Sequence, residues 1–427
     1  MQEKINKISN KENQIIEIAK EIEKAGGKLY LVGGAIRNHL LNLPITDEDY
    51  CVTGLTQKEF EQLFPQAKIQ GKDFPVYILN GKEFALARKE RKSGIGHKQF
   101  EILTDKSITI EEDLARRDIT INSIAQDVLT KEIIDPFHGR EDIQNKIIRK
   151  TTGAFAEDPL RVYRVARFAS SLDFEVEKNT LNAMTKLKEE LKTLSKERVF
   201  TELKKALSTN HPSQFFEVLK QANVLEVHFQ EVSNLIGKVQ PEEHHPKGDS
   251  YAHTMIVLDN SVKLTNNLAI RFSCLVHDLG KGNTPNEILP HHYGHEARGA
   301  PLVNQFGNRI GIPKEWLKCG KTACKWHMKA GIFEQMSAKK KVELIENVAN
   351  SSLGLEGLKI VVACDKSREG KDLQEQLESI TFAKVGKSCI EEINGEFIQK
   401  KYPTVQGEEF GKRLYEERVK WMKLIDK

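Results

Sequence analysis

The sequence predicts an α/β head with a short mixed sheet, followed by a mostly α-helical neck and an all-α domain at the C-terminal end. Over the first 150 residues, short apolar runs that stop at glycines alternate with amphipathic stretches. From there onwards, apolar residues recur at helical spacing. The length of 427 residues allows about three domains of about 150 residues each. We therefore place the head at 1–150, the neck at 151–235 and the last domain at 236–427.

Local signals predict the elements of the head. The first helix ends at Gly26 and Gly27, since glycine commonly caps a helix C-terminus. Asn80 and Gly81 favour a type I′ hairpin between two short strands. Residues 89–110 are polar and contain glycines, so we expect a mobile loop there. The expected helices are 11–25 and 35–42, and the expected strands are 29–32, 48–53, 75–79 and 83–88.

The rest of the chain is predicted to be helical. The stretch 240–249 contains two prolines and a glycine, which are typical of a linker or an edge loop. Beyond it, residues 250–427 are again mostly helical in pattern. The neck helices are expected over 157–172, 178–192, 195–208 and 211–221.

Composition excludes several classes of protein. With 39% hydrophobic and 30% charged residues, the chain is neither a fibrous repeat nor a disordered tail. No run approaches the roughly 18 apolar residues of a membrane span, and the first residues lack the apolar core of a signal peptide. Six cysteines without a Cys-x-x-Cys pair favour reduced thiols, so we predict a cytoplasmic protein without a membrane partner. A net charge of +4 allows a polyanionic partner.

The first candidate site follows the strand predicted at 29–32. Gly33 and Gly34 can bring bare backbone close to a phosphate, and Arg37 on the next helix adds a guanidinium. Asp47 and Asp49 lie two residues apart in a predicted strand, so both carboxylates face the same side. Such oxygen ligands suit Mg²⁺ ions that organise a triphosphate and activate a hydroxyl. The alternative is a glycine-rich turn beside a surface acidic pair.

This ordered set resembles the class II tRNA nucleotidyltransferases, the CCA-adding enzymes, which have a polymerase-β-like palm. The glycines and Arg37 match the family's first motif, and Asp47 and Asp49 match its metal-binding pair. Asn38 stands where that motif usually ends in Asp, so it keeps an acceptor and loses the charge. The resemblance implies that Glu83 is a further acid. It also implies a motif that binds the ribose and phosphates of the nucleotide, made of Arg116, Arg117, Asp118 and Asn122.

A second motif lies in the neck. Asp158 and Arg161 are three residues apart on one helix face and match the family's Glu-Asp-x-x-Arg motif, and Arg164 follows as a further nucleotide-binding candidate. Cytosine and adenine both present an amino donor beside a ring-nitrogen acceptor. A carboxylate acceptor and a guanidinium donor can therefore select these two bases. The alternative is that Asp158, before Pro159, only caps the helix.

Histidines mark a second chemistry in the last domain. Eight of the 13 histidines lie between residues 244 and 327. The order of His253, His277, Asp278, His295, His327 and Asp365 resembles the HD phosphohydrolase superfamily. The resemblance implies a transition metal such as Ni²⁺ or Mn²⁺ and a phosphohydrolase activity of the 2′,3′-cyclic phosphodiesterase, 2′-nucleotidase or phosphatase type. Structural roles are expected for His211 and His228, and for one or more of His244, His245, His291 and His292.

The resemblance therefore implies an enzyme that adds CCA to tRNA 3′ ends from CTP and ATP. Related possibilities are an enzyme that adds only A or only CC, and a poly(A) polymerase. A different possibility is an HD phosphohydrolase whose head only binds RNA. The sequence leaves open whether the chain is a monomer or a dimer.

Overall fold

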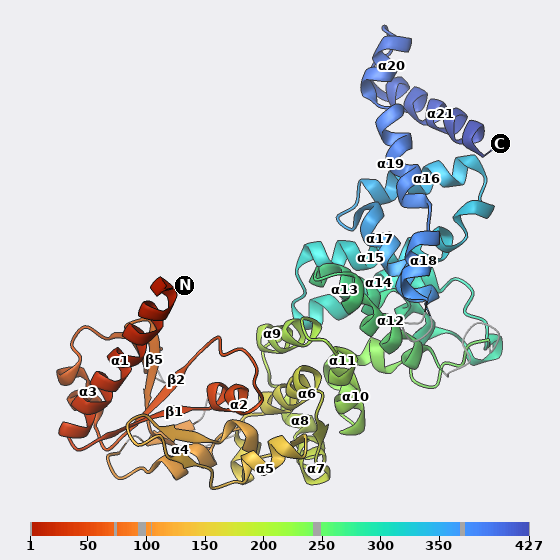
Figure 1. Ribbon diagram of the computed structural model, residues 1–427. Helices are drawn as coiled ribbons and strands as arrows, with labels where there is room; N and C mark the ends of the chain where they lie inside the picture. The colour runs from red at the N-terminus through yellow and green to blue at the C-terminus, as the bar shows by residue number, and fades with distance from the viewer. Residues whose placement is uncertain are drawn as a thin grey trace. The chain divides into compact units, whose positions relative to one another are not determined.

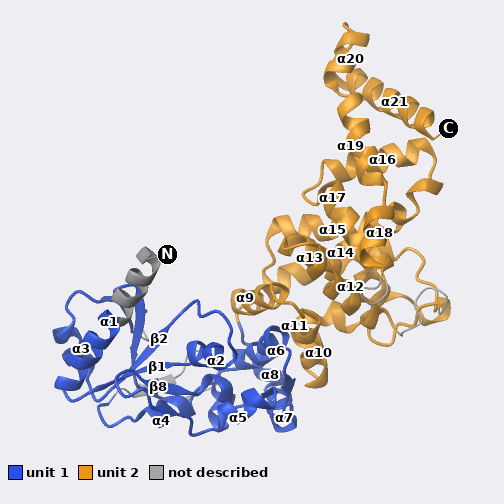
Figure 2. Ribbon diagram, in the orientation of Figure 1, with its two compact units in different colours: residues 1–194 blue, residues 195–427 orange. Residues whose placement is uncertain are grey.

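The structure is a computed structural model, and it describes residues 2–71, 75–92, 100–103, 105–241, 249–367 and 372–426. The chain divides into two compact units, Met1–Leu194 and Ser195–Lys427 (Figure 2). The boundaries expected at 150 and 235 remain predictions. None of the helices in the described part of the chain combines the length and the apolar content that a membrane span requires.

A seven-stranded mixed sheet forms the centre of unit 1, as predicted (Figure 1). Its strand order is β3-β4-β5-β2-β1-β8-β9. The pair β2–β5 is parallel and the other neighbours are antiparallel. The bounds are β1 (Lys28–Val32), β2 (Asp49–Thr53), β3 (Lys68–Gln70), β4 (Val76–Leu79), β5 (Lys82–Leu86), β8 (Ala125–Asp127) and β9 (Ile133–Ile134).

Side chains alternate between the two faces of this sheet, and each face has its own core. Leu29 packs on the face covered by α1 and α3, in one cluster with Ile22 and Phe60. Tyr30, the next residue, packs on the opposite face with Leu114 of α4. The helices of unit 1 are α1 (Gln2–Lys24), α2 (Gly34–Leu40), α3 (Gln57–Leu63), α4 (Ile110–Ala115), η1 (Thr120–Asn122), α5 (Gly139–Gln144), η2 (Gly153–Glu157), α6 (Leu160–Leu172), α7 (Lys178–Lys186) and α8 (Lys188–Leu191).

The register of the sheet places three chain segments at one end. Val32, the last residue of β1, pairs with Asp49, the first residue of β2. Asp49 in turn pairs with Glu83 on β5. The turn at Gly33 therefore begins beside Asp49, and Glu83 lies one strand further along the sheet.

Two predictions for the head have clear outcomes. The hairpin at Asn80 and Gly81 is confirmed, because both residues have positive φ angles and join the antiparallel strands β4 and β5. The loop expected over 89–110 is partly wrong, since β6 (Lys89–Lys92) pairs with β7 (Phe100–Leu103) and α4 begins at Ile110. These strands pair with each other in a separate sheet, and β6 has no apolar residue that would mark it as a strand. Residues 93–99 and 104 lie outside the described residues.

A further two-stranded sheet, β10 (Ile147–Ile148) with β11 (Glu175–Val176), lies within unit 1 and joins its last helices to the residues after α5.

Unit 2 is helical throughout its described part, as predicted (Figure 1). Buried residues of α12, α13, α15 and α17 share one apolar core, which includes Val257, Cys274, Trp326 and Val361. The bounds are α9 (Lys196–Leu207), α10 (Ser213–Gln221), α11 (Leu225–Ser233), α12 (Ser250–Leu264), α13 (Leu268–Val276), η3 (Leu279–Asn283), η4 (Asn286–Ile288), α14 (His295–Ile310), α15 (Lys314–Gly331), η5 (Phe333–Gln335), α16 (Ala338–Ala349), α17 (Gly354–Lys366), α18 (Leu373–Ser379), α19 (Phe382–Glu392), α20 (Gly395–Lys401) and α21 (Gly407–Ile425).

Candidate active sites

The acidic residues of the head lie where β1 ends and β2 begins. Asp49 is the first residue of β2, and Asp47 lies in the segment before that strand, so the strand expected over 48–53 begins one residue late. Both residues are exposed. Glu48, between them, accepts hydrogen bonds from Lys82 Nζ at 2.5 Å and from the Tyr50 hydroxyl at 3.0 Å. Glu48 is thus tied to the sheet, whereas the two aspartates are presented to solvent.

The pKa of Asp49 is raised, which fits a site for a cation. Although the residue is exposed, desolvation of the Asp49 carboxyl by the surrounding protein raises this pKa, and the negative charge of Asp47 adds to the effect against the opposing charge of Arg117. A divalent cation between two such carboxylates would relieve their repulsion. In the part of the chain that the structure describes, groups of three or more ligand atoms within 4.8 Å of one another occur only in unit 2. The head therefore offers a pair of acids rather than a closed cage.

A turn and a guanidinium lie next to these acids. Gly33 has φ 73°, and a Cβ atom there would lie 3.0 Å from Nη1 of Arg117. Glycine therefore allows both the turn and the close approach of this arginine. Arg37 on α2 donates to Asn122 Oδ1 at 2.6 Å and to Asn38 Oδ1 at 2.8 and 3.1 Å. Asn38, the departure from the family motif, supplies the expected acceptor.

The two arginines before Asp118 share a buried partner, Asp113, which was not predicted from the sequence. Arg116 Nη2 lies 2.7 Å from Asp113 Oδ1, and Arg117 Nη2 lies 3.0 Å from Asp113 Oδ2. Burial opposes the charge of Asp113, but the two guanidiniums outweigh it and lower the pKa of Asp113 to about 2. The spacing of three and four residues along α4 and its end was the available signal. Asp113 therefore orients both arginines.

Asp118 joins this motif to α6. Its Oδ1 accepts from Asn122 Nδ2 at 3.1 Å, and its Oδ2 accepts from Arg164 Nε at 2.8 Å. Although Asp118 is buried, the charge of Arg164 and these hydrogen bonds lower its pKa to about 2. The ionised carboxylate of Asp118 thus links Asn122 of the first motif set to Arg164 on α6.

Three guanidinium groups lie around the ring of Phe168 on α6. The ring centroid is 5.1 Å from Arg37, 5.6 Å from Arg164 and 3.9 Å from Arg167. Burial and the nearby charge of Arg167 lower the pKa of Arg37 to about 10. An anion such as a triphosphate would be stabilised beside this cluster. Arg167 and Phe168 belong to no motif predicted from the sequence, although their spacing from Arg164 places them on one helix face.

Asp158 and Arg161 both make contacts with the start of α6 and the segment before it. Asp158 Oδ1 accepts from the backbone N–H of Leu160 at 3.0 Å, as a capping side chain does. Arg161 is buried, and its Nη1 donates to the carbonyl of Ala154 at 2.5 Å. The capping interpretation of Asp158 therefore has a contact to support it, and a role in base selection remains a proposal.

In unit 2, five segments bring the six predicted ligands into two overlapping groups. His277 and Asp278 follow α13, and Gly280 after them packs so tightly that a Cβ atom would lie 1.9 Å from the carbonyl oxygen of His295. Glycine at this position lets η3 lie against the first turn of α14. The other residues are His253 on α12, His295 on α14, His327 on α15 and Asp365 on α17.

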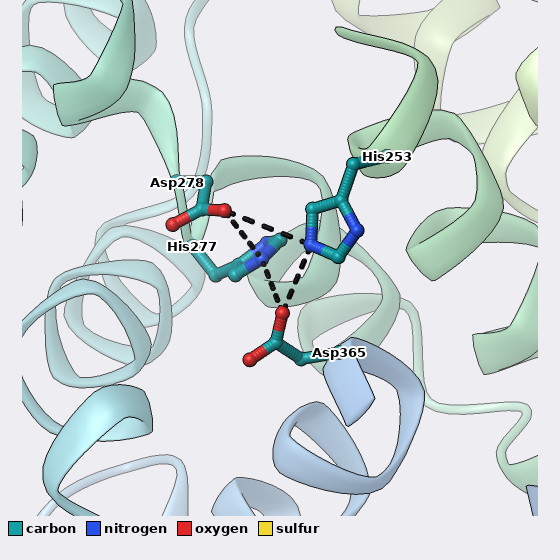
Figure 3. Close-up of side chains that lie close together, drawn as sticks. All are labelled: His253, His277, Asp278 and Asp365. Carbon is teal, nitrogen blue, oxygen red and sulfur yellow. Dashed lines mark hydrogen bonds and ion pairs between the residues drawn. The ribbon is translucent and has the colours of Figure 1, made fainter. Parts of the chain in front are cut away.

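The first group consists of His253, His277, Asp278 and Asp365 (Figure 3). Asp365 Oδ1 lies 2.9 Å from His253 Nε2 and 3.5 Å from His277 Nε2. Asp278 Oδ2 lies 3.2 Å from His277 Nε2 and 3.7 Å from His253 Nε2. Two imidazole nitrogens and two carboxylate oxygens thus face a common point, which is a ligand set suited to a transition metal.

The second group uses the other oxygen of Asp278. Its Oδ1 lies 3.3 Å from His295 Nε2 and 3.3 Å from His327 Nε2. The two carboxylate oxygens of Asp278 therefore face different sets of imidazoles, and Asp278 belongs to both groups.

The outer ring nitrogens orient three of these histidines. Nδ1 of His277, His295 and His327 lies 2.8–2.9 Å from a backbone carbonyl oxygen, to which it can donate. With Nδ1 donating to the carbonyl, Nε2 of each ring is directed into the cluster and can bind a metal ion in place of a proton. Nε2 of these three histidines and Oδ1 of Asp278 are buried without a hydrogen-bond partner among the described residues, whereas Oδ2 of Asp278 forms an ion pair with Lys281. Metal ions bound at the two groups would give these buried nitrogen and oxygen atoms the partners they lack, so the residues fit a metal site.

The electrostatics of the cluster also favour a cation. Burial would lower the pKa of His277, but the charges of Asp278 and Asp365 outweigh burial and raise it to about 10. The same interactions hold the pKa of both carboxyl groups well below their usual range despite burial. Lys281 Nζ, 2.6 Å from Asp278 Oδ2, adds a positive charge at one side.

Other histidines have structural contacts, as expected. His292 is buried between Thr284 Oγ1 at 2.7 Å and the carbonyl of Val239 at 3.0 Å. His228 is buried on α11, and this burial lowers its pKa to about 4. His244 and His245 lie outside the described residues.

Comparisons with known protein families match three consecutive parts of the chain. The family model of the poly A polymerase head domain matches residues 29–149. A model described as the probable RNA and SrmB-binding site of polymerase A matches residues 173–236, and the HD domain model matches residues 250–350. The head and HD domain families are metal-dependent, and the ligand groups of unit 2 agree with this for the HD domain.

Relatives and solved structures cover most of the chain. A multifunctional CCA protein from Psychromonas ingrahamii is 47% identical over 305 residues, which are 70% of this chain and 73% of the relative. A solved CCA-adding enzyme in complex with ATP has a TM-score of 0.65 at 20% identity, over 96% of this chain and 90% of its own. The Thermotoga maritima CCA-adding enzyme complexed with tRNA has a TM-score of 0.65 at 19% identity, over 96% and 90%. At these identities the two structures show a shared fold.

Fold and site geometry define a nucleotidyltransferase head followed by a helical HD domain. The sequence identity allows a narrower statement. The chain belongs to the family of the multifunctional CCA proteins.

Proposed function

We propose that this protein completes the 3′ ends of tRNA with C, C and A from CTP and ATP, and that unit 1 carries the site. The observation that carries this proposal is the position of Asp47 and Asp49 at the sheet end next to the Gly33 turn. The names of the relatives and of the structural neighbours support the same substrates. The predicted segment 151–235 would contribute to tRNA binding, and the matching RNA-binding family model over 173–236 supports this.

In this proposal, different residues of the head bind the metal, bind the triphosphate and orient the arginines. Asp47 and Asp49 would hold Mg²⁺, with Glu83 as a neighbouring acid, and such an ion would supply charge that activates the tRNA hydroxyl and stabilises the leaving pyrophosphate. Arg37, Arg117 and Arg164 bind the triphosphate, and the backbone at Gly33 and Gly34 approaches it. Asp118 and Asn122 hold these arginines in place, and Asp113 orients Arg116 and Arg117.

Base selection is proposed for the start of α6. Asp158 accepts from the amino group that cytosine and adenine share, and Arg161 donates to the adjacent ring nitrogen. This requires Asp158 to exchange its hydrogen bond with the Leu160 N–H for one with the base. The same carboxylate would thus cap α6 in the absence of nucleotide.

The experiment that tests the head compares two sets of neutral substitutions. Asp47→Asn combined with Asp49→Asn should reduce incorporation of CTP into a tRNA lacking its CCA by at least about a thousandfold, because both metal ligands lose their charge. Glu48→Gln is the matched control, since Glu48 lies between them but contacts Lys82 and Tyr50. Normal incorporation by the double variant would contradict the proposal.

For unit 2 we propose a metal-dependent phosphohydrolase that acts on 2′,3′-cyclic phosphates and on nucleotide phosphate esters. His253, His277, Asp278 and Asp365 would hold a transition metal such as Ni²⁺ or Mn²⁺, which supplies a hydroxide nucleophile when bound. His295 and His327 would complete the set on the other side of Asp278. Hydrolysis of 2′,3′-cyclic AMP that persists in a His277→Ala and Asp278→Ala double variant would contradict this assignment. We further propose that the protein acts in the cytoplasm.

A further inference from the structure

A cavity of about 280 Å³ adjoins the metal-ligand cluster in unit 2. His295 lines it, so the cavity reaches one of the predicted ligands. Its other lining residues include Gln240, Lys281, His291, Tyr293 and Met328. The volume is close to the lower end of the range typical of small-molecule sites.

An exposed aromatic pair lies at this cavity. The Tyr293 residue is 71% exposed, which is unusual for a large aromatic side chain. Its ring stacks on that of His291, with centroids 5.3 Å apart and planes at 20°. The pair therefore presents a flat π surface to solvent beside the cavity.

The backbone around Tyr293 is held in place although the ring is exposed. Arg298 Nη1 donates to the carbonyl of Tyr293 at 2.7 Å, and Arg298 Nη2 donates to Thr284 Oγ1 at 3.1 Å. His292 is fixed between Thr284 and Val239. A fixed backbone lowers the entropy cost of using the ring as a binding surface.

A buried side-chain amide, that of Gln240, supplies a polar group to the same cavity. Gln240 is 6% exposed, and its Oε1 accepts from Lys281 Nζ at 2.7 Å. This contact assigns the amide orientation and leaves Nε2 buried with no hydrogen-bond partner in the described part of the chain. A buried donor without an acceptor is costly, so a ligand acceptor at this position would be stabilised. Lys281 also lies 2.6 Å from Asp278 Oδ2, which links the amide to the cluster.

We infer that this cavity binds the nucleobase of the substrate while the phosphate faces the metal-ligand cluster. Tyr293 stacks on the base, and Gln240 Nε2 donates to a ring nitrogen or a carbonyl oxygen of the nucleoside. Stacking accepts any base, so the substrates are nucleotides in general rather than one nucleotide, and phosphate esters without a base bind more weakly. The inference rests on the phosphohydrolase function proposed for unit 2.

The test compares substrates with and without a base. The full chain is assayed with adenosine 2′,3′-cyclic phosphate and with the 2′,3′-cyclic phosphate of 1-O-methylribose. Tyr293→Ala should raise KM for the nucleotide roughly tenfold and leave KM for the base-free ester unchanged. Tyr293→Phe, which keeps the ring, is the matched control and should behave as wild type. Gln240→Glu, which keeps the acceptor for Lys281 and removes the donor, should also weaken nucleotide binding severalfold.

A second readout does not depend on hydrolysis. Calorimetric binding of adenosine 2′-monophosphate should weaken roughly tenfold in Tyr293→Ala and stay unchanged in Tyr293→Phe. Equal affinity of wild type and Tyr293→Ala, or equal effects on both cyclic esters, would overturn the inference. If wild type hydrolyses neither ester, the proposed phosphohydrolase function is wrong, and the binding comparison still decides whether the cavity accepts a base.

Discussion

Arg164 contacts a single oxygen of Asp118 through two nitrogens, with Nε at 2.8 Å and Nη2 at 2.7 Å from Oδ2. The contact joins α6 to the segment that follows α4 within unit 1. It joins the motif that contains Asp118 to the motif at the start of α6, although the two residues are 46 positions apart in the sequence. The head site therefore depends on this pair for its geometry as well as for its charge.

Asp118→Asn should weaken the head in both stability and nucleotide binding. Asp118 is buried and Arg164 is about one-third exposed, so we expect a loss of roughly 2 kcal/mol rather than the 3–5 kcal/mol of a fully buried pair. The KM for CTP and that for ATP should rise about tenfold together, because Arg164 would lose its orientation. Steady-state kinetics and thermal unfolding measure the two effects. Glu189→Gln, on an exposed acid of the same unit, is the control.

Arg167→Ala should reduce the affinity for both nucleotides by the same factor. Arg167 lies 3.9 Å from the Phe168 ring centroid, in the cluster beside Arg37 that would stabilise the triphosphate shared by CTP and ATP. A loss of about tenfold is expected for one charge-assisted contact. Calorimetry with each nucleotide tests this, with Arg140→Ala on an exposed arginine as control. A loss confined to one nucleotide would instead indicate a role in base selection.

Asp278→Asn should abolish metal binding in unit 2. Asp278 contributes one oxygen to each ligand group, so the substitution removes charge from both. Titration of the metal-free protein with Ni²⁺ or Mn²⁺ should show binding in wild type and a loss of at least about a hundredfold in the variant. Asp372→Asn on an exposed aspartate should leave binding unchanged. If Asp278→Asn does not fold, His253→Ala removes one ligand of the first group and provides the same comparison.

The stability of the region around α11 should fall as the pH drops below about 6.5. Burial lowers the pKa of His228 to about 4 in the folded protein, against about 6.5 when unfolded. The unfolded chain therefore binds more protons between these values, so the full stability is present above pH 6.5 and is lost towards pH 4. The loss should be about 3 kcal/mol, measured as hydrogen exchange of α11 amides at pH 7 and 4.5. His228→Gln should flatten this dependence, whereas His291→Gln on an exposed histidine should not.

The sequence predicted those parts of the head site that are close together in the chain. Gly33, Arg37, Asp47 and Asp49 belong to one strand-turn-helix-strand segment, so their proximity follows from local structure. Asp113 and Phe168 were missed because their importance depends on partners in the folded site. Asp113 orients two arginines of the next turn, and Phe168 receives Arg37 from a helix far away in the sequence.

In unit 2 the order of histidines and aspartates predicted the set of ligands. It did not predict that these ligands form two groups that share Asp278. Which oxygen of Asp278 faces which imidazoles depends on how α12, α14, α15 and α17 pack, and hydropathy patterns do not encode that packing. The cavity at Tyr293 could not be predicted from the sequence either. The exposure of Tyr293 and the lack of a hydrogen-bond partner for Gln240 Nε2 among the described residues are properties of the folded chain.

Extension of a tRNA that ends before its CCA tests the central proposal most directly. The tRNA is incubated with CTP alone, with ATP alone and with both, and the products are separated on a sequencing gel. The proposal predicts addition of two nucleotides with CTP, none with ATP and three with both. A long tail with ATP alone would indicate a poly(A) polymerase, and no extension in any lane would contradict nucleotidyl transfer by the head.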